Sequence, residues 1–188
     1  RIPCIIDGGF SAVGVESTVI SFEGDSIRLL RPGFISVEDL KEITDNVIID
    51  NGVLNMLDEG DMVASPGMKY KHYAPKADMI IVDGPQQDVI DKINMLVKEN
   101  KRTKNARVAV IATEETKELY NADYVLSMGS RDNEDDIAAH LYKILRDCDE
   151  LDVTAIYSES FATPRIGQAI MNRMLKAAGH QVIHTVEQ

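Results

Sequence analysis

Apolar positions after residue 77 alternate between short runs and helical spacing. The short runs, rich in β-branched residues, predict strands at 79–82, 107–112, 124–127, 154–157 and 182–185. Between them, apolar residues recur every three or four positions, which predicts helices over 86–100, 114–120, 134–147 and 164–178. Strands that alternate with helices form parallel β-α-β units with right-handed crossovers. Residues 78–188 are therefore predicted to form a Rossmann-like layered α/β domain with a parallel sheet.

Ligands of open α/β sheets bind beyond the carboxyl ends of the strands. In this domain those ends lead into the loops at 129–132 and 158–163, and neither loop carries a nucleophile beside a base or a cluster of metal ligands. The acidic run at 132–136 is typical of a helix start, where the helix dipole favours carboxylates. The first strand is followed by Asp83-Gly84-Pro85 instead of GxGxxG, so the pattern indicates no dinucleotide site.

The first 57 residues have a different pattern, with short alternating runs and few helical positions. Strands are predicted at 3–7, 17–22 and 27–30, followed by a short helix over 37–43. Gly24-Asp25 between two alternating runs predicts a β-hairpin. So few elements cannot bury a core alone. We therefore expect residues 1–57 to depend on missing strands, on the second domain or on another chain.

Residues 58–77 join the two patterns. An acidic run at 58–61 indicates the domain edge, and residues 65–76 read SPGMKYKHYAPK. Two prolines and a glycine exclude a helix or a central strand there. Two tyrosines, a histidine and three lysines without an acid suit a lid that covers an anion. The same residues also suit a plain connector whose tyrosines simply pack.

The composition narrows the function classes. A net charge of −11 argues against a broad nucleic-acid or membrane footprint, and 44% hydrophobic residues are enough for a sizeable core. The two cysteines, Cys4 and Cys148, are too few for a disulfide framework and suit a reducing cytoplasm. No apolar run is long enough to span a membrane. The chain starts at Arg1, within a predicted strand, so we expect a C-terminal portion of a longer protein.

Two groups in the first part can carry chemistry. Residues 14–19, GVESTV, place adjacent hydroxyl groups at a strand start after a glycine, where they can hold a carboxylate or phosphate. Arg31 precedes a Pro-Gly turn, which restricts the backbone there and holds in place a guanidinium that can bind a phosphate. Ordinary turn chemistry for the hydroxyl groups and a surface ion pair for Arg31 stay open.

The chain resembles the two-domain, YrdC-type threonylcarbamoyl-AMP synthases in three places: GVESTV at 14–19, the LRPG turn at 30–33 and SPGMKYKHYAPK at 65–76. The resemblance implies that residues 1–57 hold the terminal strands of a YrdC-like α/β catalytic domain, 58–77 an interdomain linker or lid, and 78–188 the C-terminal domain. It gives Ser17 a role in binding L-threonine, and gives Arg31 and Tyr73 roles in binding ATP. Lys69, Lys71 and His72 are further candidates.

The implied reaction is an adenylyl transfer from ATP, with L-threonine and bicarbonate as the other substrates and Mg²⁺ accompanying the ATP phosphates. It belongs to tRNA threonylcarbamoyladenosine modification, so downstream tRNA-modification proteins are expected partners. The family's KxR and SxN signatures do not occur in this sequence. The chain is therefore expected to be inactive by itself, with no catalytic and no metal-binding residue assigned.

The resemblance extends to the last helix, where Arg165, Gly167, Asn172 and Arg173 are interpreted as domain structure. The alternative for the whole chain is a non-catalytic module that senses nucleotides or binds a protein through its α/β domain.

Overall fold

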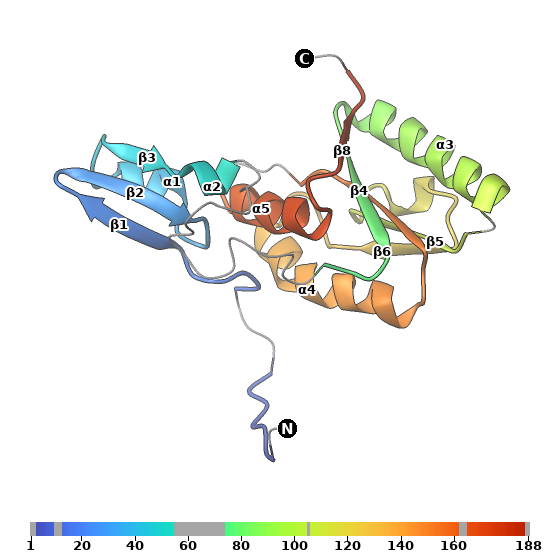
Figure 1. Cartoon of the computed structure of the whole chain (residues 1–188), viewed down its shortest axis with the longest axis horizontal. Coiled ribbons are helices and arrows are strands. Elements are labelled where there is room, and N and C mark those ends of the chain that lie inside the picture. Colours follow the sequence, from blue (N-terminus) through green and yellow to red (C-terminus); the bar gives the residue numbers. More distant parts are fainter. Residues whose placement is uncertain (1–2, 10–12, 55–73, 105, 162–164, 187–188) are drawn as a thin grey trace.

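The computed structural model describes residues 3–9, 13–54, 74–104, 106–161 and 165–186. Within these ranges the chain forms a three-stranded sheet from its first part and a five-stranded sheet from its second. The smaller sheet lies beside helices α4 (Glu134–Glu150) and α5 (Gly167–Ala177), which separate it from the larger sheet (Figure 1). In the described part of the chain, no helix has the length and apolar character needed to cross a membrane.

The three-stranded sheet contains β1 (Val19–Glu23), β2 (Ser26–Arg31) and β3 (Val47–Ile49), in that order. β1 and β2 are antiparallel, which confirms the predicted hairpin, and β3 runs parallel to β2. Helix α1 (Val37–Lys41) begins with a capping box between Ser36 and Asp39, and buried side chains from α1 and β2 pack together. Helix α2 (Asn51–Leu54) follows β3.

Three details of this part differ from the prediction. Residues 3–7 do not form a strand, and the side chains of Ile5 and Ile6 are exposed by 77% and 94%. An apolar run becomes a strand only when a neighbouring strand pairs with it. β3 and α2 were not predicted, because elements of three and four residues are too short to show a period.

The five-stranded sheet has the order β6-β5-β7-β4-β8, and all of its pairs are parallel. Its strands are β4 (Asp78–Asp83), β5 (Val108–Ala112), β6 (Tyr124–Ser127), β7 (Ala155–Glu159) and β8 (Val182–His184). This arrangement confirms the predicted α/β class with a layered parallel sheet.

Helices cover both faces of this sheet. Helix α3 (Gln86–Lys104) packs its apolar stripe on one face, where Ile93 meets side chains such as Val110. Helices α4 and α5 cover the other face, where Ile137 and Ile170 meet Ile111. Both helices end close to the predicted positions. The region predicted as a helix over 114–120 contains only a 3₁₀ turn, η1 (Lys117–Leu119). Residues 162–164, where the last helix was predicted to begin, lie outside the described residues.

The two parts of the chain pack directly on each other. Val15 belongs to the same buried cluster as α4 and α5. A Cβ at Gly14 would lie 1.9 Å from the carbonyl oxygen of Ala138, so the backbones of the two parts touch there. The first part is therefore packed on the second domain. This is one of the three alternatives expected from its small size, the others being missing strands and another chain.

Candidate functional site

Ser17 and Arg31 lie in contact at the open end of the β1–β2 hairpin. Arg31 donates from Nε and Nη2 to the Ser17 carbonyl oxygen, at 3.1 and 3.0 Å, and Nη2 lies 3.4 Å from Ser17 Oγ. The hairpin register explains the contact, because Val19 pairs with Arg31 and Ser17 lies two residues before it. The structure thus brings together the two expected site residues that it describes.

The turn after Arg31 is closed by a close backbone approach. A Cβ at Gly33 would lie 2.3 Å from the Thr18 backbone nitrogen, so this position requires a glycine. The Thr18 hydroxyl donates to the Ile35 carbonyl oxygen at 2.9 Å and accepts from the Ile35 N–H at 3.0 Å. These contacts hold the strand that carries Ser17 against the turn that follows Arg31.

Glu16, the neighbour of Ser17, is bound by both helices of the second domain. Its Oε2 accepts from the Tyr142 hydroxyl at 2.6 Å and from Arg173 Nε at 2.9 Å. Burial acts to raise the pKa of Glu16, but the hydrogen bond from Tyr142 and the charge of Arg173 outweigh it, so its pKa lies below the ordinary value. The carboxylate is therefore ionised near neutral pH and holds both helices.

Arg173 also binds the neighbour of Arg31. Its Nη1 donates to the Pro32 carbonyl oxygen at 2.7 Å, and the side chain is 7% exposed. The adjacent Asn172 donates to the carbonyl oxygen of Val53 at 2.9 Å. Arg173 and Asn172 were interpreted as domain structure, and their contacts reach beyond their own domain. They join it to the first part, through partners 119 to 157 residues earlier in the chain.

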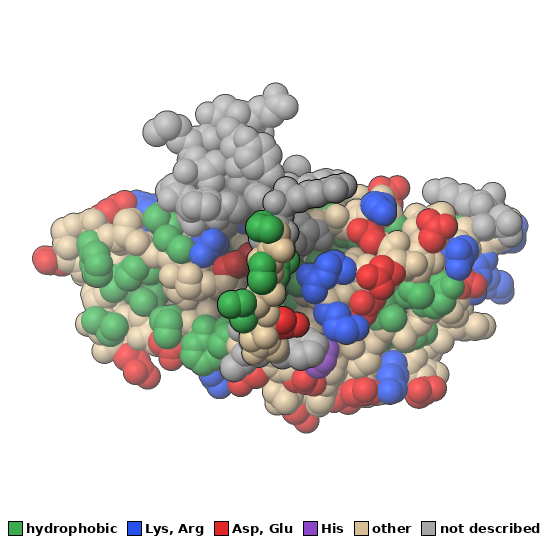
Figure 2. Space-filling model, turned by 90° about the horizontal axis from the view of Figure 1, so that it is seen from below, with side chains coloured by type: hydrophobic (Ala, Val, Ile, Leu, Met, Phe, Trp, Pro, Cys, Tyr) green, Lys and Arg blue, Asp and Glu red, His purple; other side chains and the backbone are tan. Residues whose placement is uncertain are grey.

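Arg31, Arg173 and Lys176 form a cationic group at the junction, with the Glu16 carboxylate among them. Burial, followed by the charges of Arg173 and Arg31, lowers the pKa of Lys176 to about 8. The three side chains therefore raise the positive potential on this side of the junction, in a chain whose net charge is −11. Figure 2 shows Lys and Arg side chains interspersed with Asp and Glu side chains near the junction of the two parts. A guanidinium and a hydroxyl within 3.4 Å of each other can together bind a carboxylate or phosphate.

The third expected site residue, Tyr73, lies outside the described residues, as do Lys69, Lys71 and His72. The described part of the linker starts at residue 74. There Pro75 is buried, and the Lys76 N–H donates to Asp149 Oδ1 at 2.7 Å. The linker is thus attached to the last turn of α4, which is one of the two helices that bind Glu16.

No candidate metal centre is found within the described ranges, where no three His, Cys, Asp or Glu side chains gather closely enough to hold an ion. The Mg²⁺ that the resemblance implies therefore has no identified ligand among these residues, and we assign it no role in the chemistry of this chain.

Comparisons with known proteins agree on one family. The family model described as "Threonylcarbamoyl-AMP synthase, C-terminal domain" matches residues 35–179. The chain is 43% identical to a threonylcarbamoyl-AMP synthase of Bacillus subtilis and 38% identical to one of Pyrococcus abyssi, over 97% of its length in both cases. It spans about half the length of these relatives, 51% of each.

A solved structure gives the same result. The crystal structure of P. abyssi Sua5 complexed with L-threonine superposes with a TM-score of 0.87 at 38% identity, over 97% of this chain and 51% of that one. The match includes the first part of the chain, which lies mostly before the residues that the family model covers.

Proposed function

Because the chain belongs to the family of the threonylcarbamoyl-AMP synthase C-terminal domain, we propose that it forms the C-terminal part of an enzyme that makes threonylcarbamoyl-AMP from L-threonine, bicarbonate and ATP. The observation that carries the proposal is the contact between Ser17 and Arg31 at the junction of the two parts. Two donor side chains from the ends of one hairpin share this place, inside a cationic group. The whole reaction, its place in tRNA modification and a cytoplasmic location belong to the proposal.

In this proposal Ser17 binds L-threonine and Arg31 binds the ATP phosphates. A hydroxyl group can bind a carboxylate or an amino group, whereas a guanidinium fits the paired oxygens of a phosphate. The relative of known structure that is complexed with L-threonine supports a site for that amino acid in the family. Tyr73 would add a ring and a hydroxyl group against the nucleotide, an assignment that rests on the resemblance alone.

The side chains on this chain bind and orient the substrates. A charge-assisted hydrogen bond to a phosphate contributes about 1.5–3 kcal/mol. Holding reactants in place lowers the barrier without a protein nucleophile. The bond between the α-phosphorus of ATP and its pyrophosphate would break while an oxygen of the threonine carbamate attacks that phosphorus. The residues that act on this step are expected in the part of the enzyme that the chain does not contain.

Pyrophosphate release tests the proposal. The full-length protein that contains this chain is expected to release pyrophosphate only when ATP, L-threonine and bicarbonate are all present. In that protein, Ser17→Ala is expected to raise the KM for L-threonine more than the KM for ATP. The isolated chain is expected to release none. An isolated chain that turns over, or a full-length protein that does not require L-threonine, would contradict the proposal.

A further inference from the structure

A small cavity opens at the carboxyl end of the five-stranded sheet, and none of the residues around it takes part in the Ser17–Arg31 contact. Its volume is about 180 Å³. The residues that line it are Gly84, Gln86, Val89, Arg131, Glu159 and Ser160. They come from the ends of β4 and β7, from the start of α3 and from the loop after β6.

The strand order places this cavity at a point where neighbouring strands lead to opposite faces of the sheet. β4 and β7 are adjacent and parallel. β4 leads into α3 on one face, while β7 leads into α5 on the other. In open α/β sheets, the carboxyl ends of two such strands form the crevice in which ligands bind.

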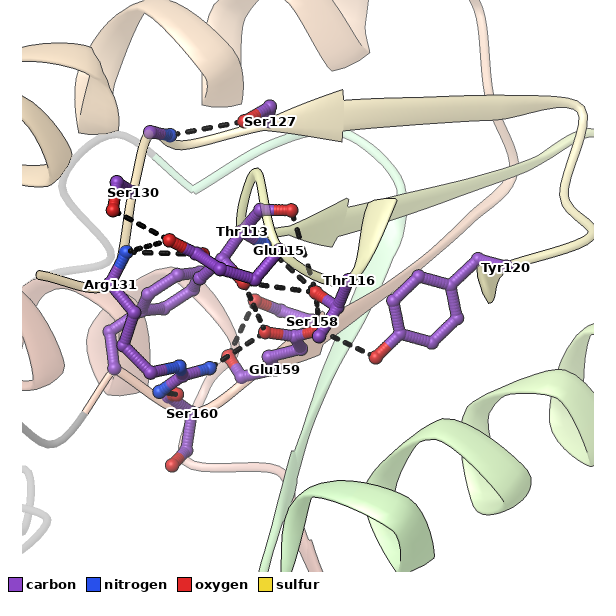
Figure 3. Close-up of polar contacts among 12 residues, drawn as sticks. Thr113, Glu115, Thr116, Tyr120, Ser127, Ser130, Arg131, Ser158, Glu159 and Ser160 are labelled. Carbon is purple, nitrogen blue, oxygen red and sulfur yellow. Dashed lines mark hydrogen bonds and ion pairs between the residues drawn. The ribbon is translucent and has the colours of Figure 1, made fainter. Parts of the chain in front are cut away.

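Arg131 is fixed at the wall of the cavity by groups that hold it on two sides. Its Nη2 donates to Glu159 Oε2 at 2.7 Å, and its Nη1 donates to the Ser160 carbonyl oxygen at 3.1 Å (Figure 3). The guanidinium also lies 5.8 Å from the centre of the Phe161 ring. Its side chain is 38% exposed, so it reaches the cavity as well as its partners.

The buried Glu159 carboxylate is surrounded by donors from the chain itself. Its side chain is 3% exposed, and Oε1 accepts from the hydroxyl groups of Tyr120, at 2.6 Å, and Thr116. Oε2 accepts from Arg131 and, at 3.5 Å, from Thr113. These donors satisfy most of the acceptor capacity of Glu159, and the charge of Arg131 offsets its negative charge. Its contribution is to orient Arg131, which has five N–H donors and uses two in these contacts.

The backbone of Arg131 is held as well. Glu115 accepts from the Ser130 hydroxyl at 2.6 Å and from the Arg131 N–H at 3.1 Å, and the hydrogen bond from Ser130 is the main cause that lowers the pKa of Glu115 to about 2. Gly129 precedes them with a φ of +113°, a conformation that favours glycine. The loop therefore presents the guanidinium before a ligand arrives, which reduces the entropy cost of binding.

We propose that this cavity binds a small phosphate-type oxyanion, inorganic phosphate or pyrophosphate. The guanidinium supplies parallel N–H donors, which fit phosphate oxygens. Gln86 begins the 19-residue helix α3 on the opposite wall, where the helix dipole also favours an anion. A tetrahedral anion can contact both walls at once, whereas a carboxylate is planar and has only two oxygens. The volume is below the range of about 300–1,000 Å³ of sites for larger ligands, which favours a small anion.

The electrostatics of the site predict modest affinity. Arg131 and Glu159 balance each other in charge, so the attraction comes from directed N–H groups and not from net charge. We expect dissociation constants of about 1 mM, which corresponds to roughly 4 kcal/mol of binding free energy. Pyrophosphate should bind more tightly than phosphate, since it offers more oxygens to the same donors.

Amide chemical shifts of the ¹⁵N-labelled chain test the proposal. Phosphate and pyrophosphate are titrated to about 20 mM at constant ionic strength, with acetate as the carboxylate probe. Saturable shifts at Gln86, Arg131 and Ser160 are the expected result. Arg131→Gln should weaken binding about tenfold or more, and Arg131→Lys should weaken it less. Arg107→Gln is the matched control, because Arg107 likewise lies 5.8 Å from the centre of an aromatic ring, that of Tyr124, and its side chain is 53% exposed.

The titrations of the variants decide between a phosphate site and no site. Unchanged phosphate binding in Arg107→Gln, together with loss of phosphate binding in a folded Arg131→Gln chain, supports the site. If Arg131→Gln unfolds, the Arg131→Lys titration decides, since a phosphate site loses affinity while the fold is kept. Three results would overturn the proposal. The first is no saturable shift with either phosphate probe, and the second is shifts that persist unchanged in both Arg131 variants. The third is acetate binding as tightly as phosphate. All measurements use this chain alone, so their failure is independent of the pyrophosphate-release test.

Discussion

Arg173 in the last helix donates a hydrogen bond of 2.9 Å to Glu16, a residue 157 positions earlier in the chain. The same guanidinium donates to the carbonyl oxygen of Pro32 at 2.7 Å. Glu16 precedes Ser17 and Pro32 follows Arg31, so one buried side chain of the second domain binds the neighbours of both proposed substrate-binding residues. The second domain thereby holds the two chain segments that carry the proposed site.

Removal of Arg173 should loosen the hairpin. In Arg173→Ala, Glu16 keeps its charge but loses an ionised partner, which is expected to cost about 1.5–3 kcal/mol of stability. We expect faster amide hydrogen exchange in β1 and β2 and little change in the five-stranded sheet. Arg146→Ala, an exposed arginine of α4, is the control. Equal exchange in all three chains would show that Arg173 does not hold the hairpin.

Arg31 is expected to control ATP affinity in the full-length protein. Arg31→Ala should weaken ATP binding about tenfold or more, since a charge-assisted contact contributes about 1.5–3 kcal/mol. Arg31→Lys should retain only part of the ATP affinity, because an ammonium group lacks the planar pair of N–H donors of a guanidinium. Arg28→Ala provides the comparison on the same strand, where Arg28 pairs with Glu23 at 2.6 Å. Calorimetric titration measures the affinities, and unchanged ATP binding in Arg31→Ala would refute the assignment.

Gly14 is expected to tolerate no side chain. In Gly14→Ala the new methyl group would lie 1.9 Å from the Ala138 carbonyl oxygen, and a helix backbone cannot move away easily. We expect a loss of about 1–3 kcal/mol in the free energy of unfolding, as for other overpacked sites. Gly8→Ala is the control, because nothing lies within 4 Å of its added Cβ. Urea unfolding measures both variants, and equal midpoints would show that the close approach is absent in solution.

Cys148 links stability to alkaline pH. Burial, then the charges of Asp147 and Asp149, raises the pKa of its thiol from 9.0 to about 12. The unfolded chain loses this proton from about pH 9, whereas the folded chain keeps it. The contribution of the buried thiol to the free energy of unfolding is therefore present below pH 9 and is lost as the pH rises toward 12. The difference in unfolding free energy between the original chain and Cys148→Ala should therefore shrink between pH 8 and pH 10.5. A constant difference would mean that the thiol is not buried.

Native thiol chemistry provides a second check. Cys4 is exposed and Cys148 is 1% exposed. At pH 8, iodoacetamide should modify Cys4 rapidly and Cys148 only when the chain unfolds. Equal labelling of both residues under native conditions would contradict the structure.

Local patterns in the sequence are enough to predict the hairpin and the five-stranded sheet. The Gly24-Asp25 turn and the alternation of strands with helices act over short stretches, so tertiary packing does not override them. Residues 3–7 show the opposite case, since their apolar run has no strand to pair with in the described structure. A strand needs a partner that the run itself cannot specify.

The contacts that build both sites could not be predicted in the same way. The family resemblance pointed to Ser17 and Arg31, and the hairpin register explains why they meet. The pairing of Arg173 with Glu16 depends on how two parts of the chain pack. The contacts of Glu159 with donors from the segment after β5 and the loop after β6 depend on sheet order. Glu159 was expected in the loop at 158–163, whereas the structure makes it the last residue of β7, with a side chain that is 3% exposed.

Exposed apolar side chains of the three-stranded sheet have a consequence for handling the chain. Phe22 on β1 and Ile48 on β3 are exposed by 77% and 39%, and β1 is an edge strand of this sheet in the described structure. Figure 2 shows hydrophobic side chains gathered over this part of the molecule. An apolar edge strand is a template for pairing with another copy. Sedimentation at increasing protein concentration should therefore reveal reversible self-association of the purified chain. The Phe22→Lys chain should remain monomeric at the same concentrations.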